Sequence, residues 1–354
     1  MMTILLTGAS GFLGSNLAKN LCKNYRIIAI VRKNIAKISH LPIKIYNIDK
    51  VTLENIFAKH RPQIIIHTAV CYGRAGEPLS HLVQTNLIFS LRLLELSVQF
   101  GAKIFINTDT LQHDNLSNYT ISKKTLRDYL PHFSNDLNLI NCRIEHIYGF
   151  GDDESKFVTY LLKAFGRNAS HIPLTHGRQM RDFVHIDDVI SAYKLILDSA
   201  IKNPINALQS YDIGSGEFVS VRKFVEVLLS ECKKYQNIST MLDFGAVPYN
   251  HIGEISENLT PLTNLGFKAK YPYKNGIAVL VKEHFANIFA ESNIADSALY
   301  PNWGGAERDE LRIIYAFFVE SGVKFIVFVR LANLDSAPRN NSYPQPNPKD
   351  LKVA

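Results

Sequence analysis

A glycine-rich turn lies near the start of the chain, between a short apolar run and a segment that favours a helix. The run is Thr3-Ile4-Leu5-Leu6, and residues 15–21 follow the turn. Glycines allow a backbone to bend tightly and to approach a diphosphate closely, and the first N–H groups of a helix attract anions. The order of strand, turn and helix therefore predicts dinucleotide binding rather than mere packing of a helix on a strand. The predicted cofactor contacts in this turn are Gly8, Ser10, Gly11, Phe12, Leu13 and Gly14.

Two cations follow the second apolar run, at the place where a dinucleotide-binding fold reads the adenosine ribose. The run is 25–31, and Arg32 and Lys33 come directly after it. A carboxylate there would bind the ribose 2′-hydroxyl of NAD, whereas cations pair with the 2′-phosphate of NADP. We therefore expect NADPH as the cofactor, with NAD as the alternative if these cations form only a solvated turn. Asp49, after the third apolar run, is either an adenine contact or an exposed turn residue.

The composition is that of a soluble enzyme of moderate charge. The chain has 354 residues, of which 46% are hydrophobic, and a formal net charge of +7. It contains no apolar stretch long enough to span a membrane and no signal-like N-terminus, so we expect a cytoplasmic protein with no membrane partner. The spread of charge suits small polyanions and not nucleic acid. The four cysteines lack metal-ligand spacing, which suits reduced thiols and predicts no metal site.

Apolar runs alternate with segments of helical periodicity through the first 150 residues. This alternation is typical of a Rossmann-type α/β fold, a doubly wound parallel sheet. The looser pattern that follows indicates a smaller C-terminal substrate-binding lobe. We divide the chain into an NADP-binding domain (1–150, exchanging strands with later segments), a nucleotide-sugar-binding lobe (151–289) and an atypical tail (290–354). The predicted strands of the sheet are 3–6, 25–31, 43–46, 64–67, 103–107 and 139–144.

The tail has a composition unlike the rest of the chain. It holds two apolar segments, Ile313–Val319 and Val323–Val329, and a stretch rich in Pro and Asn, 337–349, that we expect to be disordered. Charged residues within the apolar part argue against a membrane span. Three interpretations stay open for the tail: a dimer element, an appended hairpin, or a segment with no selected role.

A tyrosine, a lysine and a threonine form the predicted catalytic group. Tyr119 and Lys123 are four residues apart, so on a helix they project from one face. An ammonium group beside a phenol would lower the pKa of Tyr119, which could then exchange a proton with a ketone or an alcohol. Thr108, just after the fifth predicted strand, would hold the same oxygen. A chance surface pair is the alternative, and the preceding glycine-rich turn favours catalysis.

These motifs resemble those of extended short-chain dehydrogenases/reductases of the nucleotide-sugar epimerase/dehydratase family, over about residues 2–285. Within that family the chain is similar to the CDP-abequose synthase-like reductases, which use NADPH to reduce the 4-ketone of a CDP-linked dideoxyhexose for surface polysaccharide. The pieces shared with the family are 7–14, 67–69, 85–87, 119–123, 143, 148–149, 181–188 and 212–216. Those shared with the reductases are 107–110, 145–149, 152–157 and 244–249.

The resemblance implies further roles. Ala69 and Asn86 would line the cofactor site, and Arg181 would meet the diphosphate of a nucleotide sugar, unless it pairs with Asp187 or Asp188. Asp109 would act near the 4-position of the sugar or only cap a turn. We expect a CDP-linked substrate and a homodimer. The substrate-binding residues implied are Tyr72, Asp109, His146, Lys156, Arg181 and Tyr249.

Two departures from the family pattern bear on the reaction. The 4,6-dehydratases of the family have a glutamate where this chain has Thr110, and without that base dehydration is disfavoured. Relatives also have an arginine where Asn250-His251 stands, so one diphosphate contact is either missing or supplied by His251. We interpret His67 as a packed core residue and 152–154 as a solvated acidic loop.

Three functions compete. The first is an NADPH-dependent reductase of a nucleotide-linked 4-ketosugar, in which Tyr119 donates the proton, Lys123 tunes Tyr119 and holds the nicotinamide ribose, and Thr108 binds the 4-oxygen. The second is a 4-epimerase with tightly held NAD, against which the cations after the second strand argue. The third is a non-catalytic NADP-binding regulator, which the presence of the Tyr/Lys pair disfavours.

Overall fold

The protein is described by a computed structural model that covers residues 1–354 except 33–34, 75, 249–256, 300–315, 321–322 and 328–354. It divides into two compact units, Met1–Phe289 and Ala290–Ala354. The division proposed at residue 150 stays a prediction, because both sides of it belong to the first unit.

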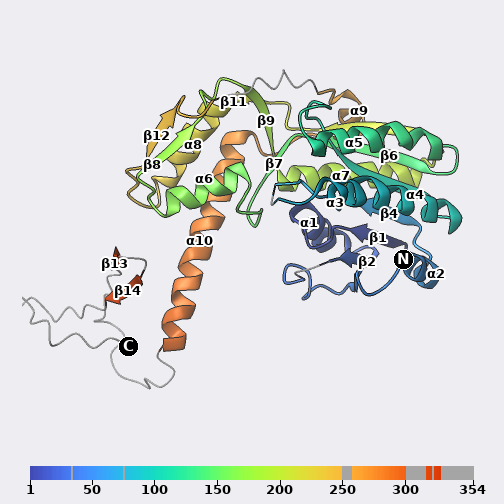
Figure 1. Ribbon diagram of the computed structural model, residues 1–354, viewed down its shortest axis with the longest axis horizontal. Coiled ribbons are helices and arrows are strands. Elements are labelled where there is room, and N and C mark those ends of the chain that lie inside the picture. Colours follow the sequence, from blue (N-terminus) through green and yellow to red (C-terminus); the bar gives the residue numbers. More distant parts are fainter. Residues whose placement is uncertain (33–34, 75, 249–256, 300–315, 321–322, 328–354) are drawn as a thin grey trace, which may run out of the picture. The chain divides into compact units, whose positions relative to one another are not determined.

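A seven-stranded sheet forms the centre of the first unit, with all neighbouring strands parallel (Figure 1). All six predicted strands are present, which confirms the Rossmann-type fold. Tyr211, within the range assigned to the substrate-binding lobe, lies opposite Cys142 of the main sheet, so a later segment adds a strand to this sheet, in line with the predicted exchange of strands. In spatial order the strands are β10 (Leu208–Ile213), β6 (Asn138–Ile144), β5 (Ile104–Thr110), β4 (Ile64–His67), β1 (Thr3–Thr7), β2 (Arg26–Val31) and β3 (Lys44–Asn47).

The strand order reverses beside β1. The chain runs outward from β1 to β2 and β3, and then crosses back to β4 on the other side of β1. Thr7 at the end of β1 is in register with His67 at the end of β4, and His67 is in register with Asn107 of β5. Open α/β sheets bind ligands at such a switch point, outside the carboxyl ends of the strands. The glycine-rich turn leaves β1 at this edge.

Helices cover both faces of the sheet, which explains why its strands are continuously apolar. Side chains of Ile4 and Leu6 belong to one core, and Leu5 between them belongs to the other. The first core includes α1 (Phe12–Leu21) and α7 (Ile186–Lys202). The second includes α2 (Leu53–His60), α4 (Phe89–Gln99) and α5 (Asn118–Tyr129). Between β4 and α4 lie α3 (Leu79–Val83) and the π-helix η1 (Gln84–Ile88), and η2 (Leu130–Phe133) follows α5.

The later part of the first unit has a third apolar core of its own. Phe183 and Phe224 stack there, with ring centroids 3.8 Å apart. The strands of this part are β7 (His146–Tyr148), β9 (Met180–His185) and β11 (Phe218–Ser220) in one sheet, and β8 (His171–Leu174) with β12 (Met241–Phe244) in another. Its helices are α6 (Phe157–Gly166), α8 (Val221–Cys232), α9 (Thr260–Thr263) and α10 (Tyr273–Leu299), the last of which runs into the second unit.

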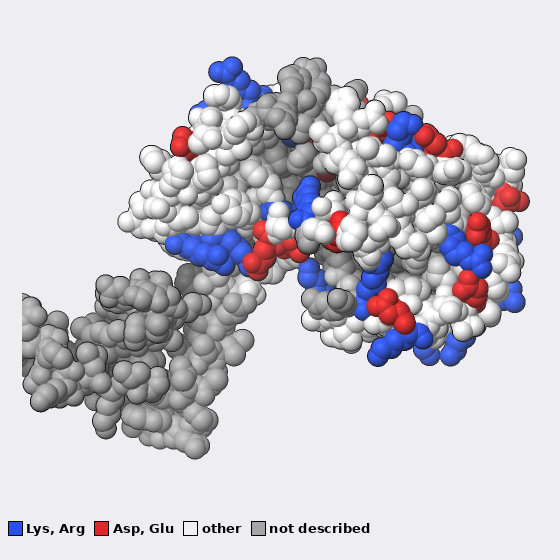
Figure 2. All heavy atoms as spheres, viewed as in Figure 1, with Lys and Arg blue, Asp and Glu red and all other residues white. Residues whose placement is uncertain are grey.

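The second unit contains an antiparallel hairpin of β13 (Ala316–Glu320) and β14 (Val323–Val327), in which Ala316 pairs with Val327. The stretch expected to be disordered, 337–349, lies outside the described residues. Among the described residues, no helix is both long and apolar enough to cross a membrane. On the face shown in Figure 2, the visible Lys and Arg side chains lie among Asp and Glu side chains.

Candidate active site

The glycine-rich turn has the backbone geometry that its sequence predicts. Gly8 has a φ of +65°, and a Cβ on it would lie 2.6 Å from the backbone nitrogen of Ala69. A Cβ on Gly14 would collide with the carbonyl oxygen of Gly8. Gly11, which donates its N–H to the Gly8 carbonyl at 2.9 Å, is the N-cap of α1 and has no side chain to cap the helix. The first turn of α1 is therefore built to receive an anion.

The other predicted residues of the turn flank this helix start. Ser10, Phe12 and Leu13 are half-buried, and the last two pack against the core between the sheet and α1. Ala69 donates its N–H to the hydroxyl of Thr7 at 3.4 Å, which joins the loop after β4 to the end of β1. The turn and this loop thus form the two walls of the switch-point crevice.

His67 is a packed core residue beneath the crevice, as its sequence context indicates. Its Nδ1 lies 2.7 Å from the Thr7 hydroxyl and its Nε2 lies 2.8 Å from the Ser90 hydroxyl. The side chain is 1% exposed, and burial together with the nearby charge of Lys123 lowers the pKa of His67 to about 3. His67 therefore stays neutral and positions its neighbours, and it is no candidate for proton transfer.

Asn86 holds the loop after β4 against the helix of the predicted catalytic group. Its side-chain oxygen accepts the N–H of Cys71 at 2.7 Å, and its amide nitrogen donates to the Cys71 carbonyl at 2.8 Å and to the Ser122 hydroxyl at 3.0 Å. The resemblance implies a cofactor contact for Asn86. In the structure its side chain positions this loop, and the cofactor contact stays a prediction.

The residues predicted to read the adenosine end lie at the edge of β2 and β3. The Arg32 guanidinium donates to the Thr85 hydroxyl at 2.8 Å and lies 3.1 Å from Nε2 of His81, so it spans from the end of β2 to the segment before α4. Asp49 is exposed after β3, and its N–H donates to the side chain of Asn47 at 2.8 Å. Lys33 lies outside the described residues.

Helix α5 begins at a residue that places the tyrosine in its first turn and the lysine one turn later. The Ser117 hydroxyl accepts the N–H of Thr120 at 3.3 Å, and the Thr120 hydroxyl accepts the N–H of Ser117 at 2.9 Å. This capping box starts the helix at Asn118. Tyr119 and Lys123 therefore share one face of α5, as predicted.

Two of the three predicted catalytic residues, Lys123 and Thr108, are in contact at the end of β5, and Tyr119 lies near Thr110 of the same strand. The Lys123 ammonium, only 5% exposed, donates to the backbone carbonyl of Thr108. Thr110, two residues further along β5, hydrogen-bonds to the phenol of Tyr119 through its hydroxyl. Thr110 stands where the dehydratases have their glutamate, so a neutral hydroxyl replaces a base beside the tyrosine. Because β5 adjoins β4, and β4 adjoins β1, this group faces the glycine-rich turn across the crevice.

The electrostatics of the tyrosine differ from the sequence-based prediction. Burial, reinforced by the nearby Tyr72 and Asp109, raises the pKa of Tyr119 above its ordinary value, and the hydrogen bond from Thr110 opposes this. Burial also lowers the pKa of Lys123. The prediction that the ammonium pulls the phenol toward neutrality is therefore wrong for this cofactor-free structure, because desolvation outweighs it. Tyr119 is a protonated phenol here, which is the form that donates a proton.

Asp109 lies below the site and does not face it. Its side chain has no exposed surface; Oδ2 accepts from Nε of Arg127 at 2.7 Å and from the Asn141 amide at 2.9 Å, and Oδ1 accepts the N–H of Thr110 at 2.8 Å. The prediction that Asp109 binds the substrate is therefore revised. We assign it a positioning role that joins the end of β5 to α5 and β6.

A second group of polar side chains gathers around Tyr72, beside Tyr119. The two tyrosine rings are 5.1 Å apart, and Nζ of Lys156 lies 3.4 Å from the centre of the Tyr72 ring. Arg74 approaches the same ring at 5.4 Å. Burial raises the pKa of the neighbouring Asp152 to about 6, whereas Asp153 and Glu154 of the same acidic loop are exposed. Tyr72 and Lys156, both predicted substrate contacts, thus lie together next to the proton donor.

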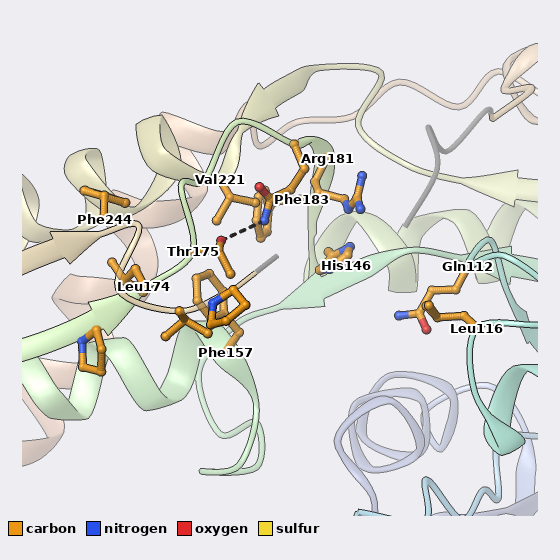
Figure 3. A pocket seen from close by; sticks show the side chains of 14 residues that line it. Gln112, Leu116, His146, Phe157, Leu174, Thr175, Arg181, Phe183, Val221 and Phe244 are labelled. Carbon is orange, nitrogen blue, oxygen red and sulfur yellow. Dashed lines mark hydrogen bonds between the residues drawn. The ribbon is translucent and has the colours of Figure 1, made fainter. Parts of the chain in front are cut away.

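A cavity of about 470 Å³ extends from the segment before α5 into the later lobe. Gln112 and Leu116 face it from one side, and the lobe residues face it from the other (Figure 3). Neither Tyr119 nor Thr108 lines this cavity, so it is a compartment beside the catalytic group and does not contain it. Its lobe residues are His146, Phe157, Pro173, Leu174, Thr175, Gln179, Arg181, Phe183, Val221, Phe244, Val247 and Pro248.

Arg181 and His146 are the ionisable residues of this cavity wall, and Glu145 holds both. Nε of Arg181 lies 3.2 Å from a Glu145 carboxylate oxygen, and Nδ1 of His146 lies 2.9 Å from the same oxygen. Arg181 is 5% exposed. The alternative partner Asp188 instead accepts backbone N–H groups of residues 270 and 271. The predicted substrate contact Tyr249 and its neighbour His251 lie outside the described residues.

Three residues that shape the site are missing from the predicted site residues. Arg127 balances the charge of Asp109, Glu145 holds Arg181, and the Tyr193 hydroxyl lies 2.7 Å from that of Thr108. Arg127 is separated from Tyr119 by two helical turns, which could have marked it as a residue of the same face. Glu145 lies inside a piece shared with the family reductases. Nothing in the sequence marks Tyr193 apart from its place on the apolar face of a helix.

Comparisons with known proteins agree with this geometry. The chain is 30% identical over 294 residues to CDP-abequose synthase of Salmonella typhimurium, across 79% of this chain and 97% of that enzyme. It is 33% identical to CDP-abequose synthase of Salmonella muenchen, across 77% and 95% of the two chains. The solved structure of UDP-glucose 4-epimerase from Thermotoga maritima with UDP-glucose superposes with a TM-score of 0.69 at 24% identity, covering 81% of this chain and 100% of that one, and shows the common fold.

The family model for "NAD dependent epimerase/dehydratase family" matches residues 4–214, which run from the first strand of the sheet to the end of its last. The residues matched contain the glycine-rich turn, the Tyr/Lys pair and Arg181. Members of this family are NAD(P)-dependent oxidoreductase-type enzymes. The chain belongs to the NAD dependent epimerase/dehydratase family of extended short-chain dehydrogenases/reductases, in which it is similar to the CDP-abequose synthases.

Proposed function

We propose that the protein is an NADPH-dependent reductase of the 4-keto group of a nucleotide-linked deoxyhexose, in the synthesis of surface polysaccharide. The observation that carries the proposal is the contact of Lys123 with Thr108 at the end of β5, with Tyr119 on the same face of α5 as Lys123 and with the glycine-rich turn at the end of β1, two strands away in the same sheet. Similarity to CDP-abequose synthases over nearly their whole length supports a CDP-linked 4-keto-6-deoxy or 3,6-dideoxy sugar.

The chemistry divides between cofactor and protein. The reduced nicotinamide, when bound in the crevice, supplies a hydride for the ketone carbon. Tyr119 donates its phenolic proton to the ketone oxygen, so that the C=O bond becomes an alcohol. The Thr108 hydroxyl holds that oxygen, and Lys123 holds the end of β5 through the Thr108 carbonyl. The Thr110 hydroxyl cannot act as the carboxylate base of a dehydratase, so the reaction proposed is reduction alone.

The cavity beside the catalytic group suits the nucleotide part of the substrate. Its volume of about 470 Å³ lies in the range of small-molecule sites, which is roughly 300–1,000 Å³. Phe157, which is 37% exposed, offers a face for a base, and Arg181 offers a guanidinium for a diphosphate. Tyr72 and Lys156 lie on the Tyr119 side, which suits the sugar.

A 4-epimerase that keeps NAD bound is the second candidate, favoured by the epimerase fold of the solved structures. Two observations favour the reductase. Arg32 is a cation at the ribose-reading position, which suits NADPH, and the raised pKa of Tyr119 suits a proton donor more than a base. The intact Tyr/Lys pair disfavours a non-catalytic regulator.

Assays of the unmutated protein test this proposal directly. We expect NADPH to be oxidised in the presence of one or more CDP-, dTDP- or UDP-linked 4-keto-6-deoxy sugars, with the CDP-linked substrate reacting fastest. Protein purified without added cofactor should carry little NAD. Stoichiometric bound NAD, together with interconversion of 4-epimers and no net NADPH consumption, would identify an epimerase instead. Sedimentation of the same sample tests the predicted homodimer.

Replacement of Arg32 by aspartate should reverse the preference for NADPH. The variant loses a charge-assisted contact to the 2′-phosphate and places a carboxylate beside it, which should weaken NADPH binding by about 1–3 kcal/mol. Affinity for NADH should stay the same or rise. Fluorescence titration with both cofactors measures the effect, and Arg61→Asp, at the exposed end of α2, is the matched control. Equal affinity of the unmutated protein for NADH and NADPH would contradict the assignment.

The rate of ketone reduction should be insensitive to pH through the neutral and mildly alkaline range. A raised pKa keeps the Tyr119 phenol protonated, and proton donation is lost only as the pH rises through that raised pKa. Measurement of kcat at saturating NADPH from about pH 6.5 to about pH 9.5, below the ordinary tyrosine pKa of about 10, tests this expectation. A fall in kcat with an apparent pKa near neutrality would show that Lys123 controls the phenol after all.

A further inference from the structure

Thr108 is held from two sides: one neighbour bonds its backbone carbonyl and another bonds its side-chain hydroxyl. Its backbone carbonyl accepts the ammonium of Lys123 from α5, and its hydroxyl lies 2.7 Å from the hydroxyl of Tyr193. Tyr193 comes from α7, on the other face of the sheet, and is 85 residues away in sequence. The two contacts together fix both the backbone and the side chain of the residue proposed to hold the substrate oxygen.

The phenol of Tyr193 has a buried environment that leaves it few partners. Tyr193 is 1% exposed and packs in the core between the sheet, α1 and α7. Besides Thr108, its neighbour is the thiol of Cys142, which is directly opposite Thr108 in the pairing of β5 and β6. Thr108 itself is half-buried, whereas Tyr193 is buried.

We propose that Tyr193 is a positioning residue, which donates its hydroxyl hydrogen to Thr108 and so turns the hydrogen of Thr108 toward the oxygen at C4 of the substrate. A hydroxyl has one hydrogen and accepts through its lone pairs. When the Thr108 hydroxyl oxygen accepts the hydrogen of Tyr193, the hydrogen of the Thr108 hydroxyl is free to be donated to the ketone oxygen. The two hydrogen bonds, from Tyr193 to Thr108 and from Thr108 to the ketone oxygen, form a chain in which the first bond polarises the second.

The direction of this chain follows from the chemistry of its members. A phenol is a stronger acid than an aliphatic alcohol and is therefore the better donor of the pair, while the sulfur of Cys142 is a weak donor and a weak acceptor. Burial raises the pKa of Tyr193 far above its ordinary value, so it keeps the hydrogen that it donates. Without Tyr193, the Thr108 hydroxyl could rotate among several partners and would meet the ketone in the correct orientation less often.

This inference rests on the proposed function and is tested by a double-mutant cycle at Thr108 and Tyr193. Tyr193→Phe removes one hydroxyl. It should lower kcat about five- to tenfold, which corresponds to the free energy of one neutral hydrogen bond. The Kd for the cofactor should stay unchanged. Thr108→Val should lower kcat by at least about tenfold. In the Thr108→Val background, Tyr193→Phe should change kcat by less than about twofold, because its only route to the substrate is already gone.

Tyr211→Phe is the matched control. Tyr211 packs in the same core, and its hydroxyl donates to Gln209 at 3.1 Å rather than to a residue of the site. This variant should keep kcat within about twofold of the unmutated protein, and the melting temperatures of the two tyrosine variants should be similar. A loss of kcat in Tyr193→Phe that persists in full in the Thr108→Val background would overturn the inference, since the residue would then act through general stability of the fold.

The cycle separates this inference from the proposed function. If the unmutated protein turns over none of the 4-keto sugar nucleotides and interconverts no 4-epimers, the proposed function fails, and the inference fails with it. If the unmutated protein is active and the two substitutions are additive, only the inference fails. Activity together with strong non-additivity supports both.

Discussion

Replacement of Tyr119 by phenylalanine is expected to lower kcat for ketone reduction by at least about a hundredfold, the typical contribution of a general acid. The ring stays in place against Tyr72, while the phenolic hydrogen and the bond to Thr110 are lost. Because the hydroxyl acts on the reacting oxygen and the glycine-rich turn holds the cofactor, the affinity for NADPH should change by less than about twofold. Stopped-flow kinetics under single turnover would measure the chemical step directly.

Tyr129→Phe is the control for this result. Tyr129 lies at the far end of the same helix, is 45% exposed and contacts only His132 among the aromatic rings described. Removing its hydroxyl should leave kcat and stability unchanged. Turnover of Tyr119→Phe at the rate of the unmutated protein would mean that another group donates the proton, and the proposed reaction would lose its central residue.

Replacement of Asp109 by alanine is expected to destabilise the protein by about 2–4 kcal/mol, because it leaves the Asn141 amide without its buried acceptor and takes from the Arg127 guanidinium one of its two carboxylates, the other being Asp114 at 3.0 Å. The carboxylate has no exposed surface, and the Arg127 side chain is 25% exposed, which lets water relieve part of the loss. Urea unfolding of the cofactor-free protein measures the change in the free energy of unfolding. This would be the largest stability effect of the substitutions considered.

The matched control is the exposed ion pair on the same helix. Asp128 accepts from Lys124 at 2.7 Å, but the two side chains are 61% and 41% exposed, so Asp128→Ala should change stability by less than about 0.5 kcal/mol. Asp109→Asn, which keeps the shape of the side chain and removes its charge, should also destabilise the protein. If Asp109→Asn kept full stability and lost activity only through a higher KM for the sugar nucleotide, Asp109 would be a substrate contact after all.

Residues predicted from local motifs lie where the prediction places them. Gly8 has the positive φ, Gly14 has the close backbone contact, and Tyr119 and Lys123 share one helical face, because each depends on a few neighbouring residues of the chain. The roles that the family resemblance implies stay predictions. His146 and Arg181 line the cavity beside Glu145, and Asn86 and Asp109 are bonded to other protein groups.

The electrostatic prediction was wrong for a physical reason that no motif contains. The spacing of Tyr119 and Lys123 predicts the mutual influence of their charges, but the sign of a pKa shift depends on how far each group is removed from water. That depends on the packing of Tyr72, the end of β5 and α5 around the phenol, which only the folded chain provides.

The sequence by itself determined the strands of the sheet, the phosphate-binding turn and the helical spacing of the proton donor, because these follow from hydrophobic periodicity and from the backbone freedom of glycine. The tertiary structure alone decided that β10 completes the main sheet, that Arg127 and Asn141 take the carboxylate of Asp109, and that Tyr193 supports Thr108. Such contacts join residues that are far apart in the chain. Their partners are chosen by the packing of whole strands and helices, and a local pattern cannot encode that choice.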